Sequence, residues 1–316
     1  MKITVLGGGG VRSPFLAKSL ISNAERVGLT EIVFMDSNEE KLNIYGKIAE
    51  KIAEKINPGI KFWLTSDPVA ALKDANFIIT TIRVGEDKAR VLDERIALNN
   101  GILGQETTGA GGFAMSLRSI PKILEYCKMI EQYSAEGAML FNFTNPSGIV
   151  TQAIHLSGFK NVYGICDAPS EFIKQVAKVL EKPLEEVSAE CFGLNHLSWF
   201  RNIKVNGKDA MEELLAKKEL YTETEMKFFD PELVKISGNL LLNEYLYYFY
   251  YRERAEKAII NSEKTRGETI LEINKQMTKE LKEVDIDKDT DKAFEIYMRN
   301  YMKRENSYME IESKTE

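Results

Sequence analysis

The feature that most constrains the fold is a run of four glycines between an apolar strand and a helix, close to the N-terminus. Residues 2–6, KITVL, have the composition of a short buried strand, and Gly7–Gly10 follow at once. The next stretch, VRSPFLAKSLISNA, has the apolar spacing of a helix. A strand that turns this tightly into a helix is typical of α/β folds with a parallel sheet.

The same alternation continues along the chain. The apolar stretch EIVFMD ends in Asp36 and predicts a second strand, and residues 39–56 have the spacing of a long helix. Further strands are predicted at 62–66, 75–83 and 138–146, the last preceded by a helix at 119–134. This order predicts a Rossmann-type doubly wound parallel sheet with helices on both faces.

After NVYGICD the pattern changes to longer helices and mixed strands, which indicates a second, α+β lobe. We therefore expect one domain at 1–160 and a second at 161–316. The dipeptide Asn206-Gly207 predicts a hairpin turn between two strands of the second domain.

The glycine run and the acid of the second strand predict a dinucleotide site. Glycines let the backbone approach a pyrophosphate, and the following helix N-terminus offers unpaired N–H groups. The third glycine of the usual motif is absent, because Arg12 or Ser13 stands in its place. Asp36 ends the second strand where an acid would bind the ribose hydroxyls of NAD and repel the extra phosphate of NADP. The alternative is a tight turn in which Asp36 only caps the next helix. The expected cofactor contacts are Gly7, Gly8, Gly9, Gly10, Val11, Arg12 and Asp36.

Composition limits the partners. The chain has 316 residues, with 42 Lys and Arg against 48 Asp and Glu, so its net charge of -6 gives no general attraction to nucleic acid or to an anionic membrane. No stretch approaches the ~20 apolar residues of a membrane span. Three irregularly spaced cysteines predict no disulfide framework, and we expect a reducing, cytoplasmic setting.

Several longer stretches carry a resemblance to a known family. They are GGGGVRSP, TIRVGED, GQETTGAGGF, NFTNPSGIVTQA, GICDAP, GLNHLSW, EYLYYFYYRE and TRGE, in register from residue 1 to about 311. Together they closely resemble glycoside hydrolase family 4, the NAD- and metal-dependent 6-phospho-glycosidases. The resemblance implies a lobe like that of lactate and malate dehydrogenases, a bound NAD that is used and regenerated, and a divalent metal, usually manganese. NAD-dependent glycosidases do not use the common pair of carboxylates.

The resemblance also implies a mechanism. NAD would oxidise the sugar at C3, a base would remove the C2 proton, the C1 substituent would leave, and water addition and re-reduction would follow. Cys166 and His196 match the family's metal ligands. Thiolate and imidazole alone would suggest zinc, and manganese comes only from the resemblance. Taken singly, Cys166 could be a buried cysteine and His196 a core histidine.

The remaining site residues are also carried over from the family. Asp167 matches the acid that protonates the leaving oxygen, although it could instead cap the following helix. Tyr245 matches the base, while Tyr247, Tyr248, Tyr250 and Tyr251 could be helix core or lobe interface. Arg83, Asn145 and Arg266 match substrate-binding residues, with a one-residue slip in the register at Arg266. Guanidinium suits bidentate phosphate capture.

Two departures from the family pattern leave alternatives open. Glu86 stands where relatives commonly have a second glycine, and the chain stops near Ser307-Tyr308-Met309, where relatives continue. The resemblance implies hydrolysis of 6-phospho-β-glucosides, with the anomer open. The expected substrate is a phosphorylated disaccharide or an aryl 6-phosphoglucoside, and the expected assembly is a homo-oligomer. One alternative is an NAD-dependent dehydrogenase of a small hydroxy acid, disfavoured because His155 has no partner acid in view. The other is an inactive NAD-binding fragment, suggested by the early stop.

Overall fold

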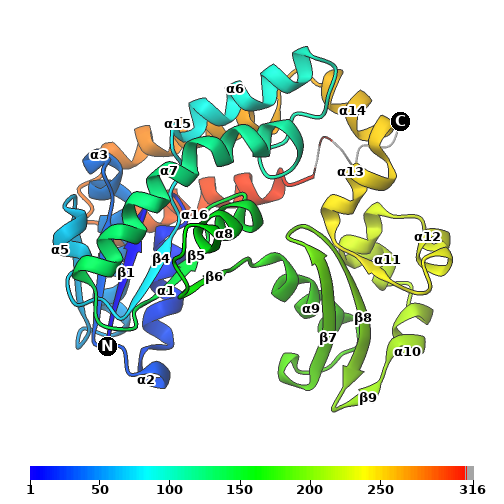
Figure 1. Ribbon diagram of the computed structural model, residues 1–316, viewed down its shortest axis with the longest axis horizontal. Helices are drawn as coiled ribbons and strands as arrows, with labels where there is room; N and C mark the ends of the chain where they lie inside the picture. The colour runs from blue at the N-terminus through cyan, green and yellow to red at the C-terminus, as the bar shows by residue number, and fades with distance from the viewer. Residues whose placement is uncertain (310, 312–316) are drawn as a thin grey trace. The chain divides into compact units, whose positions relative to one another are not determined.

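The computed structural model describes residues 1–309 and 311, which fall into two compact units. The first unit combines Met1–Ile165 with Ile259–Ile311, and the second spans Cys166–Ala258. Each unit is described by itself below, and Figure 1 labels their helices and strands. Within the described residues, no helix is long and apolar enough to cross a membrane.

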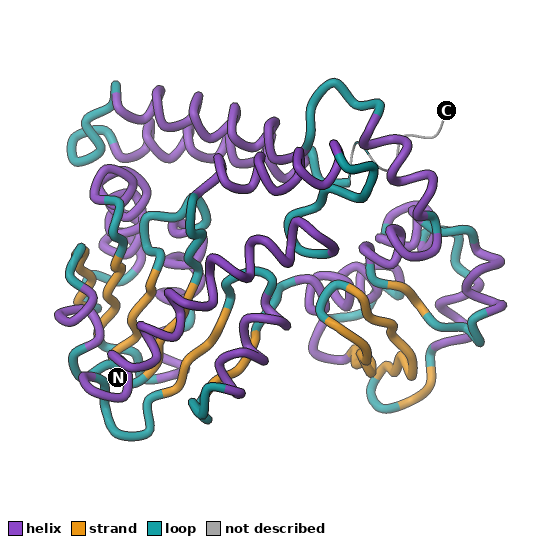
Figure 2. The backbone as a smooth tube through the Cα atoms, turned by 45° about the horizontal axis from the view of Figure 1, so that its top comes forward, coloured by secondary structure: helices purple, strands orange, loops and turns teal. Residues whose placement is uncertain are grey.

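The first unit is built on a six-stranded parallel sheet in the order β3-β2-β1-β4-β5-β6. This is the Rossmann strand order, so the predicted fold class is confirmed. In Figure 2 the strands of this sheet are the orange segments of the N-terminal unit. Their bounds are β1 Lys2–Leu6, β2 Glu31–Met35, β3 Lys61–Thr65, β4 Phe77–Thr80, β5 Met139–Asn142 and β6 Val162–Gly164.

Helices cover both faces of this sheet because successive strand side chains point to opposite sides. Val5 packs with α1 and α4 on one face, whereas Leu6 packs with α5, α7 and α8 on the other. The helix predicted at 39–56 contains a π-helical turn in its first half. The bounds are α1 Ser13–Ser22, α2 Ala24–Val27, α3 Glu39–Lys41, η1 Leu42–Gly46, α4 Lys47–Ile56, α5 Pro68–Leu72, α6 Glu86–Asn99, α7 Gly109–Tyr133 and α8 Ser147–Leu156.

The C-terminal helices α15 (Arg266–Lys282) and α16 (Thr290–Asn306) belong to the first unit. Their buried apolar side chains, among them Met277 and Tyr297, form one core cluster with Ile48 of α4. The division therefore differs from the predicted domains at 1–160 and 161–316, since the chain returns to the first unit after residue 258. The physical reason is this long-range apolar packing, which no local pattern reveals.

The second unit contains a small antiparallel sheet in the order β10-β8-β7, with β9 paired to β8. Helix α9 packs on it, and the rings of Phe172 and Phe200 lie 4.5 Å apart. Val205 pairs with Lys208, so the predicted Asn206-Gly207 hairpin turn is confirmed. The bounds are α9 Ala168–Val179, η2 Leu184–Glu186, β7 Val187–Leu194, β8 Leu197–Val205, β9 Lys208–Asp209, α10 Met211–Ala216, α11 Leu220–Glu223, η3 Glu225–Phe228, α12 Pro231–Ile236, β10 Leu241–Leu242, η4 Glu244–Leu246, α13 Tyr247–Tyr250 and α14 Arg252–Ile260.

Candidate active site

The glycine run after β1 allows no side chain at its first two positions. Gly7 has a φ of 101°, and a Cβ there would lie 2.7 Å from the backbone oxygen of Thr81. A Cβ on Gly8 would lie 2.5 Å from the Cβ of Phe34. The turn is therefore pressed against the two neighbouring strands, and only glycine fits it.

Asp36 lies beside this turn at the carboxyl end of β2. Its Oδ2 accepts from the Gly9 N–H at 2.9 Å and its Oδ1 from the Asn38 N–H at 2.9 Å. Burial raises the pKa of Asp36, and these two bonds oppose the rise. The side chain of Asn38, not that of Asp36, caps α3. Since a carboxylate can accept about four hydrogen bonds, Asp36 retains lone pairs for a ligand hydroxyl.

Val11 and Arg12 connect the glycine turn to α1 and to the C-terminal helix. Arg12 is the N-cap residue of α1, and no side chain caps that helix. The Val11 carbonyl accepts from the Tyr297 hydroxyl at 2.9 Å, and Arg12 lies 3.9 Å from Glu305. At the start of α1 the Ser13 N–H donates to the Gly10 carbonyl at 3.0 Å and Pro14 has no N–H, so the first turn of this helix offers an anion few donors.

Arg83 and Asn145 leave adjacent strands at equivalent positions. Thr80 of β4 pairs with Asn142 of β5, and each predicted site residue lies three residues further along. The Thr80 hydroxyl also donates to Asn142 Oδ1 at 2.9 Å, which fixes the register. The structure therefore brings both to the carboxyl edge of the sheet, where ligands of such folds bind.

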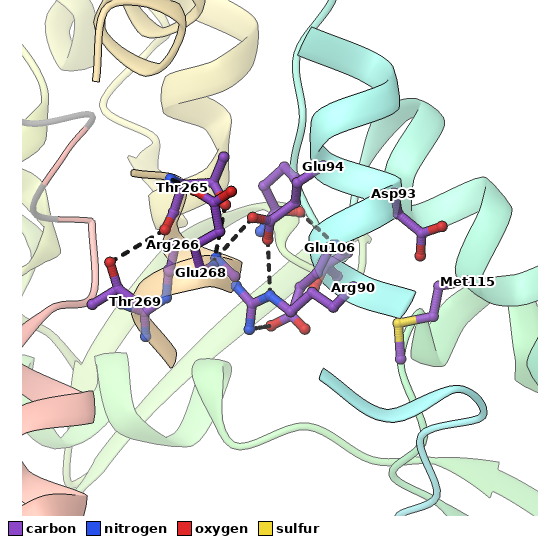
Figure 3. A network of polar contacts seen from close by, with 12 residues as sticks. Arg90, Asp93, Glu94, Glu106, Met115, Thr265, Arg266, Glu268 and Thr269 are labelled. Atoms are coloured by element: carbon purple, nitrogen blue, oxygen red, sulfur yellow. Dashed lines mark hydrogen bonds and ion pairs between the residues drawn. The ribbon is translucent and has the colours of Figure 1, made fainter. Parts of the chain in front are cut away.

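A network of charged side chains, among them Arg90, Glu94 and Glu106, reaches the start of α15 (Figure 3). Arg83 Nη2 lies 2.7 Å from Glu106 Oε2, and Arg90 Nη1 lies 3.1 Å from Glu106 Oε1. Arg90 Nε also donates to Glu94 Oε1 at 2.8 Å. The other oxygen of Glu94 accepts from the Gly267 N–H at 2.7 Å. Glu94 thereby joins parts of the chain that are 173 residues apart.

Arg266 is the first residue of α15, next to the capped end of that helix. Thr265 and Glu268 form a capping box there. The guanidinium of Arg266 donates to Ser307 Oγ at 2.9 Å and lies 4.9 Å from the Tyr308 ring centroid. The network of Arg90, Glu94 and Glu106 therefore connects Arg83 to Gly267, the residue that follows Arg266.

Arg304, which the motifs did not indicate, lies near Arg83 and Glu106. Burial lowers the pKa of Arg304, and the charges of Arg12 and Arg83 lower it further, while Glu106 opposes them. Arg83, Arg90 and Arg304 all lie close enough to Glu106 to lower its pKa, and such a group of positive charges favours an anion. A signal was available in the sequence, because Arg304 follows the buried Tyr297 and Tyr301 at helical spacing.

Cys166 and His196 come together within the second unit. Asn195 and His196 form the two-residue turn between β7 and β8, and His196 has a left-handed φ of 61°. Cys166 lies just before the N-cap of α9. The Cys166 Sγ and His196 Nε2 atoms are 3.3 Å apart.

The surroundings favour charge on both members of this pair. Burial opposes the charged form of His196, but hydrogen bonds with Cys166 and Glu244 raise its pKa to about 10. Burial likewise works against the thiolate, yet the hydrogen bond with His196 leaves the pKa of Cys166 below its usual value. A metal that binds this pair would take the place of the proton on Nε2.

The donor set fits a divalent metal. With metal–sulfur and metal–nitrogen bonds of about 2.3 and about 2.05 Å, the two atoms would be about 3.1 Å apart at a right angle and about 3.6 Å apart at a tetrahedral angle. The observed 3.3 Å lies between these values. The described residues contain no group of three or more His, Cys, Asp or Glu arranged for a metal. The pair would therefore leave positions open for substrate oxygens.

Tyr245 and Asp167 lie beside the pair. The ring of Tyr245 stacks on that of His196, with centroids 4.7 Å apart and an interplanar angle of 26°. Asp167 Oδ1 is 3.9 Å from Cys166 Sγ. Asp167 occupies the N-cap position of α9, but its side chain makes no capping bond. Of the other tyrosines, Tyr247 and Tyr248 are buried in aromatic packing.

Two glutamates of this site, one buried and one partly buried, were not identified from the sequence. Glu244 Oε1 accepts from His196 Nδ1 at 2.7 Å, and Glu244 is 1% exposed. Burial and the neighbouring Glu244 raise the pKa of Glu225 to about 9. The position of Glu244 inside the mostly apolar stretch LLNEYL could have indicated it. Glu225 lies in a polar stretch that gives no such signal. Glu86, the departure noted above, forms an ion pair with Lys41 at 3.0 Å.

The first unit thus has the Rossmann fold, and the second brings Cys166 and His196 together at the spacing of two metal ligands. The model of a family described as "Family 4 glycosyl hydrolase" matches residues 2–182, and that of its C-terminal domain matches residues 191–312. The chain belongs to family 4 of the glycosyl hydrolases, and the resemblance seen in its motifs is confirmed.

Relatives and solved structures agree with this assignment. The chain is 36% identical to the probable 6-phospho-beta-glucosidase of Bacillus subtilis (strain 168), over 88% of this chain and 65% of that protein. It is 34% identical to the 6-phospho-beta-glucosidase of Escherichia coli (strain K12), over 90% and 65%. The chain thus spans slightly less than two thirds of these two relatives.

Among solved structures, the 6-phospho-beta glucosidase of Thermotoga maritima with manganese, NAD+ and glucose-6-phosphate has a TM-score of 0.80. It is 32% identical, over 89% of this chain and 66% of that one. A lactate dehydrogenase from Eimeria maxima, 16% identical over 81% of this chain and 74% of that one, has a TM-score of 0.52 and shares the fold alone.

Proposed function

We propose that the chain hydrolyses 6-phospho-glucosides with the help of NAD and a divalent metal, Mn²⁺. The observation that carries this proposal is the pair Cys166–His196, whose donor atoms are 3.3 Å apart beside the stacked ring of Tyr245. Membership of family 4 supports it, as do relatives named 6-phospho-glucosidases. When bound, NAD would accept and return a hydride at C3, and the metal would act as a Lewis acid at the C2 and C3 oxygens.

The first unit would bind the cofactor and the phosphate. Gly7–Gly10, Val11 and Arg12 would hold the pyrophosphate, and Asp36 would accept from the ribose hydroxyls. Arg83, Asn145 and Arg266 would hold the sugar phosphate. Two observations support this assignment. Arg83 and Asn145 follow the carboxyl ends of adjacent strands, and the network through Glu94 and Glu106 connects Arg83 to the start of α15.

The second unit would move protons. Tyr245 would take the C2 proton, since its hydroxyl belongs to the ring that stacks on the proposed ligand His196. Asp167 would protonate the oxygen that leaves C1, because it is next to Cys166 in the chain and its side chain does not cap α9. Elimination, water addition and re-reduction would then complete the hydrolysis.

We infer a preference for 6-phospho-β-glucosides, either phosphorylated disaccharides or aryl compounds. The two β-glucosidase relatives are 36% and 34% identical, whereas a phospho-alpha-glucosidase of Clostridium acetobutylicum is 32% identical over 88% of this chain and 66% of that protein. Three free cysteines are consistent with the predicted cytoplasmic setting. Assembly as a homo-oligomer also stays a prediction, which sedimentation would measure.

The deciding experiment incubates the purified chain with NAD, Mn²⁺, a thiol and aryl 6-phosphoglucosides of each anomer. Cleavage of the β anomer that requires both NAD and Mn²⁺ is the expected result. Cleavage of the α anomer alone would reverse the anomer assignment. Binding of NAD without any cleavage would favour the inactive fragment, and net NADH formation from a small hydroxy acid would favour the dehydrogenase.

A further inference from the structure

We propose that Glu244 is the positioning residue of His196, holding the tautomer whose Nε2 faces Cys166 and a metal. The inference rests on the proposed metal site and gives a role to Glu244, the first residue of the motif EYLYYFYYRE. Glu244 immediately precedes Tyr245, so both belong to the short helix η4.

The contacts of the His196 ring define the tautomer. Nδ1 lies 2.7 Å from Glu244 Oε1, and Nε2 lies 3.3 Å from Cys166 Sγ. A carboxylate only accepts hydrogen bonds, so Nδ1 must carry a proton. Once the imidazole is neutral, its lone pair is therefore on Nε2, the nitrogen on the side of the thiolate.

The backbone alone would not hold the ring in this way. His196 lies in a two-residue turn with a φ of 61°, outside the regular strands on either side. Tyr245 packs on the face of the ring and Glu244 holds its edge. A face contact still allows the ring to rotate in its own plane, whereas the bond to Nδ1 prevents the exchange of the two nitrogens.

Burial makes the contact with Glu244 strong. Its side chain is 1% exposed and that of His196 is 10% exposed, so water has little access to compete for the bond. Because Glu244 and Tyr245 are consecutive, one helical turn sets both the orientation of the metal ligand and the position of the proposed base.

Metal titration of the full-length, metal-free chain tests the proposal. Free Mn²⁺ would be followed by electron paramagnetic resonance for wild type, Glu244→Ala, Glu244→Gln and Glu190→Gln. Glu244→Ala should weaken Mn²⁺ binding about 10- to 100-fold. Glu244→Gln should recover most of the affinity, because its amide oxygen still accepts from Nδ1. Glu190→Gln is the matched control, an exposed position on β7 that pairs with Arg201, and should bind as wild type does.

Nitrogen NMR with Zn²⁺ as a diamagnetic probe reads the tautomer directly. The chain has only two histidines, so a His155→Gln variant assigns the signals. Wild type should show a protonated Nδ1 and a metal-bound Nε2. A Zn²⁺-loaded His196 with a protonated Nε2, or wild-type Mn²⁺ affinity in a folded Glu244→Ala, would overturn the proposal. The NMR measurement decides the matter even where Glu244→Ala does not fold.

Failure of the metal site itself would look different. If wild type and Cys166→Ser bind Mn²⁺ equally or not at all, the proposed metal site is wrong, and this inference is wrong with it. If Cys166→Ser abolishes binding but both Glu244 variants match wild type in affinity and tautomer, only the role of Glu244 is wrong.

Discussion

Two pairs of glutamates, one in each unit, are both largely shielded from solvent, but the charges of their neighbours are opposite. Glu94 and Glu106 of the first unit face arginines, and Glu225 and Glu244 of the second unit face each other. Burial would raise the pKa of Glu106, but the charges of Arg83 and Arg90 hold it well below its usual value. For Glu225, burial and a neighbouring carboxyl act in the same direction and raise the pKa to about 9.

The charged groups around an acid, and not its burial alone, decide the direction in which its pKa moves. In the first unit, arginines lower the pKa of Glu106. In the second unit, burial and the neighbouring Glu244 raise the pKa of Glu225. The pKa of the same residue type is thus moved in opposite directions in the two units.

The largest effect should follow loss of the proposed base. Replacing Tyr245 by phenylalanine should lower kcat about 10²- to 10⁴-fold, with NAD and Mn²⁺ affinities nearly unchanged, because the hydroxyl contributes proton transfer and little binding. Steady-state kinetics and titrations would measure both. Product formed by wild type in D₂O should carry deuterium at C2 while NAD shows no net change. Its absence, together with no primary isotope effect at C2, would exclude this role.

Removing Glu94 should break the network of the first unit. Glu94→Ala leaves the buried guanidinium of Arg90, 3% exposed, without one of its carboxylates. A buried charge that loses its partner costs about 3–5 kcal/mol of unfolding free energy. Urea unfolding would measure the change, with Glu171→Ala in an exposed ion pair with Lys174 as a control that should change little. A loss as small as that of the control would show that Glu106 alone suffices for Arg90.

Asp36 is a third case, because this partly buried carboxyl accepts hydrogen bonds from backbone N–H groups and, within the described part of the chain, does not form an ion pair with an arginine. Asp36→Ala should weaken NAD binding about 10- to 100-fold, since hydrogen bonds to a charged group contribute about 1.5–3 kcal/mol. Binding of the sugar phosphate should stay the same. Calorimetric titration of each ligand gives the measurement, and equal losses for both would indicate a folding defect.

The smallest effect concerns the pH dependence of the second unit. The pKa of Glu225 is about 9 in the folded chain, above about 4.3 when unfolded, so the folded state retains a proton that the unfolded state releases. This contribution is complete at acid pH and is lost as the pH rises toward 9. Glu225→Gln should change stability by about 1 kcal/mol or less near pH 5 and flatten the decline up to pH 9. Parallel declines in both proteins would argue against a protonated Glu225.

Glu106 should show the reverse dependence. Its lowered pKa contributes stability above the unfolded value of about 4.3 that is lost as the pH falls through the folded value. Hydrogen exchange by mass spectrometry would follow the two units separately.

Local patterns were sufficient for much of this molecule. The alternation of apolar strands and amphipathic helices predicted the parallel sheet, and Gly7 and the Asn206-Gly207 turn were readable because their backbone demands concern adjacent residues. The motifs around Cys166 and His196 selected two residues that the structure brings within 3.3 Å.

Long-range contacts decided the rest. The return of α15 and α16 to the first unit depends on Tyr297 meeting Ile48, and the Glu94–Gly267 bond spans 173 residues. The protonation of Glu225 and the tautomer of His196 both depend on Glu244, which lies elsewhere in the sequence. A pKa is set by the charges and the burial around a group, and the tertiary fold alone brings those neighbours together.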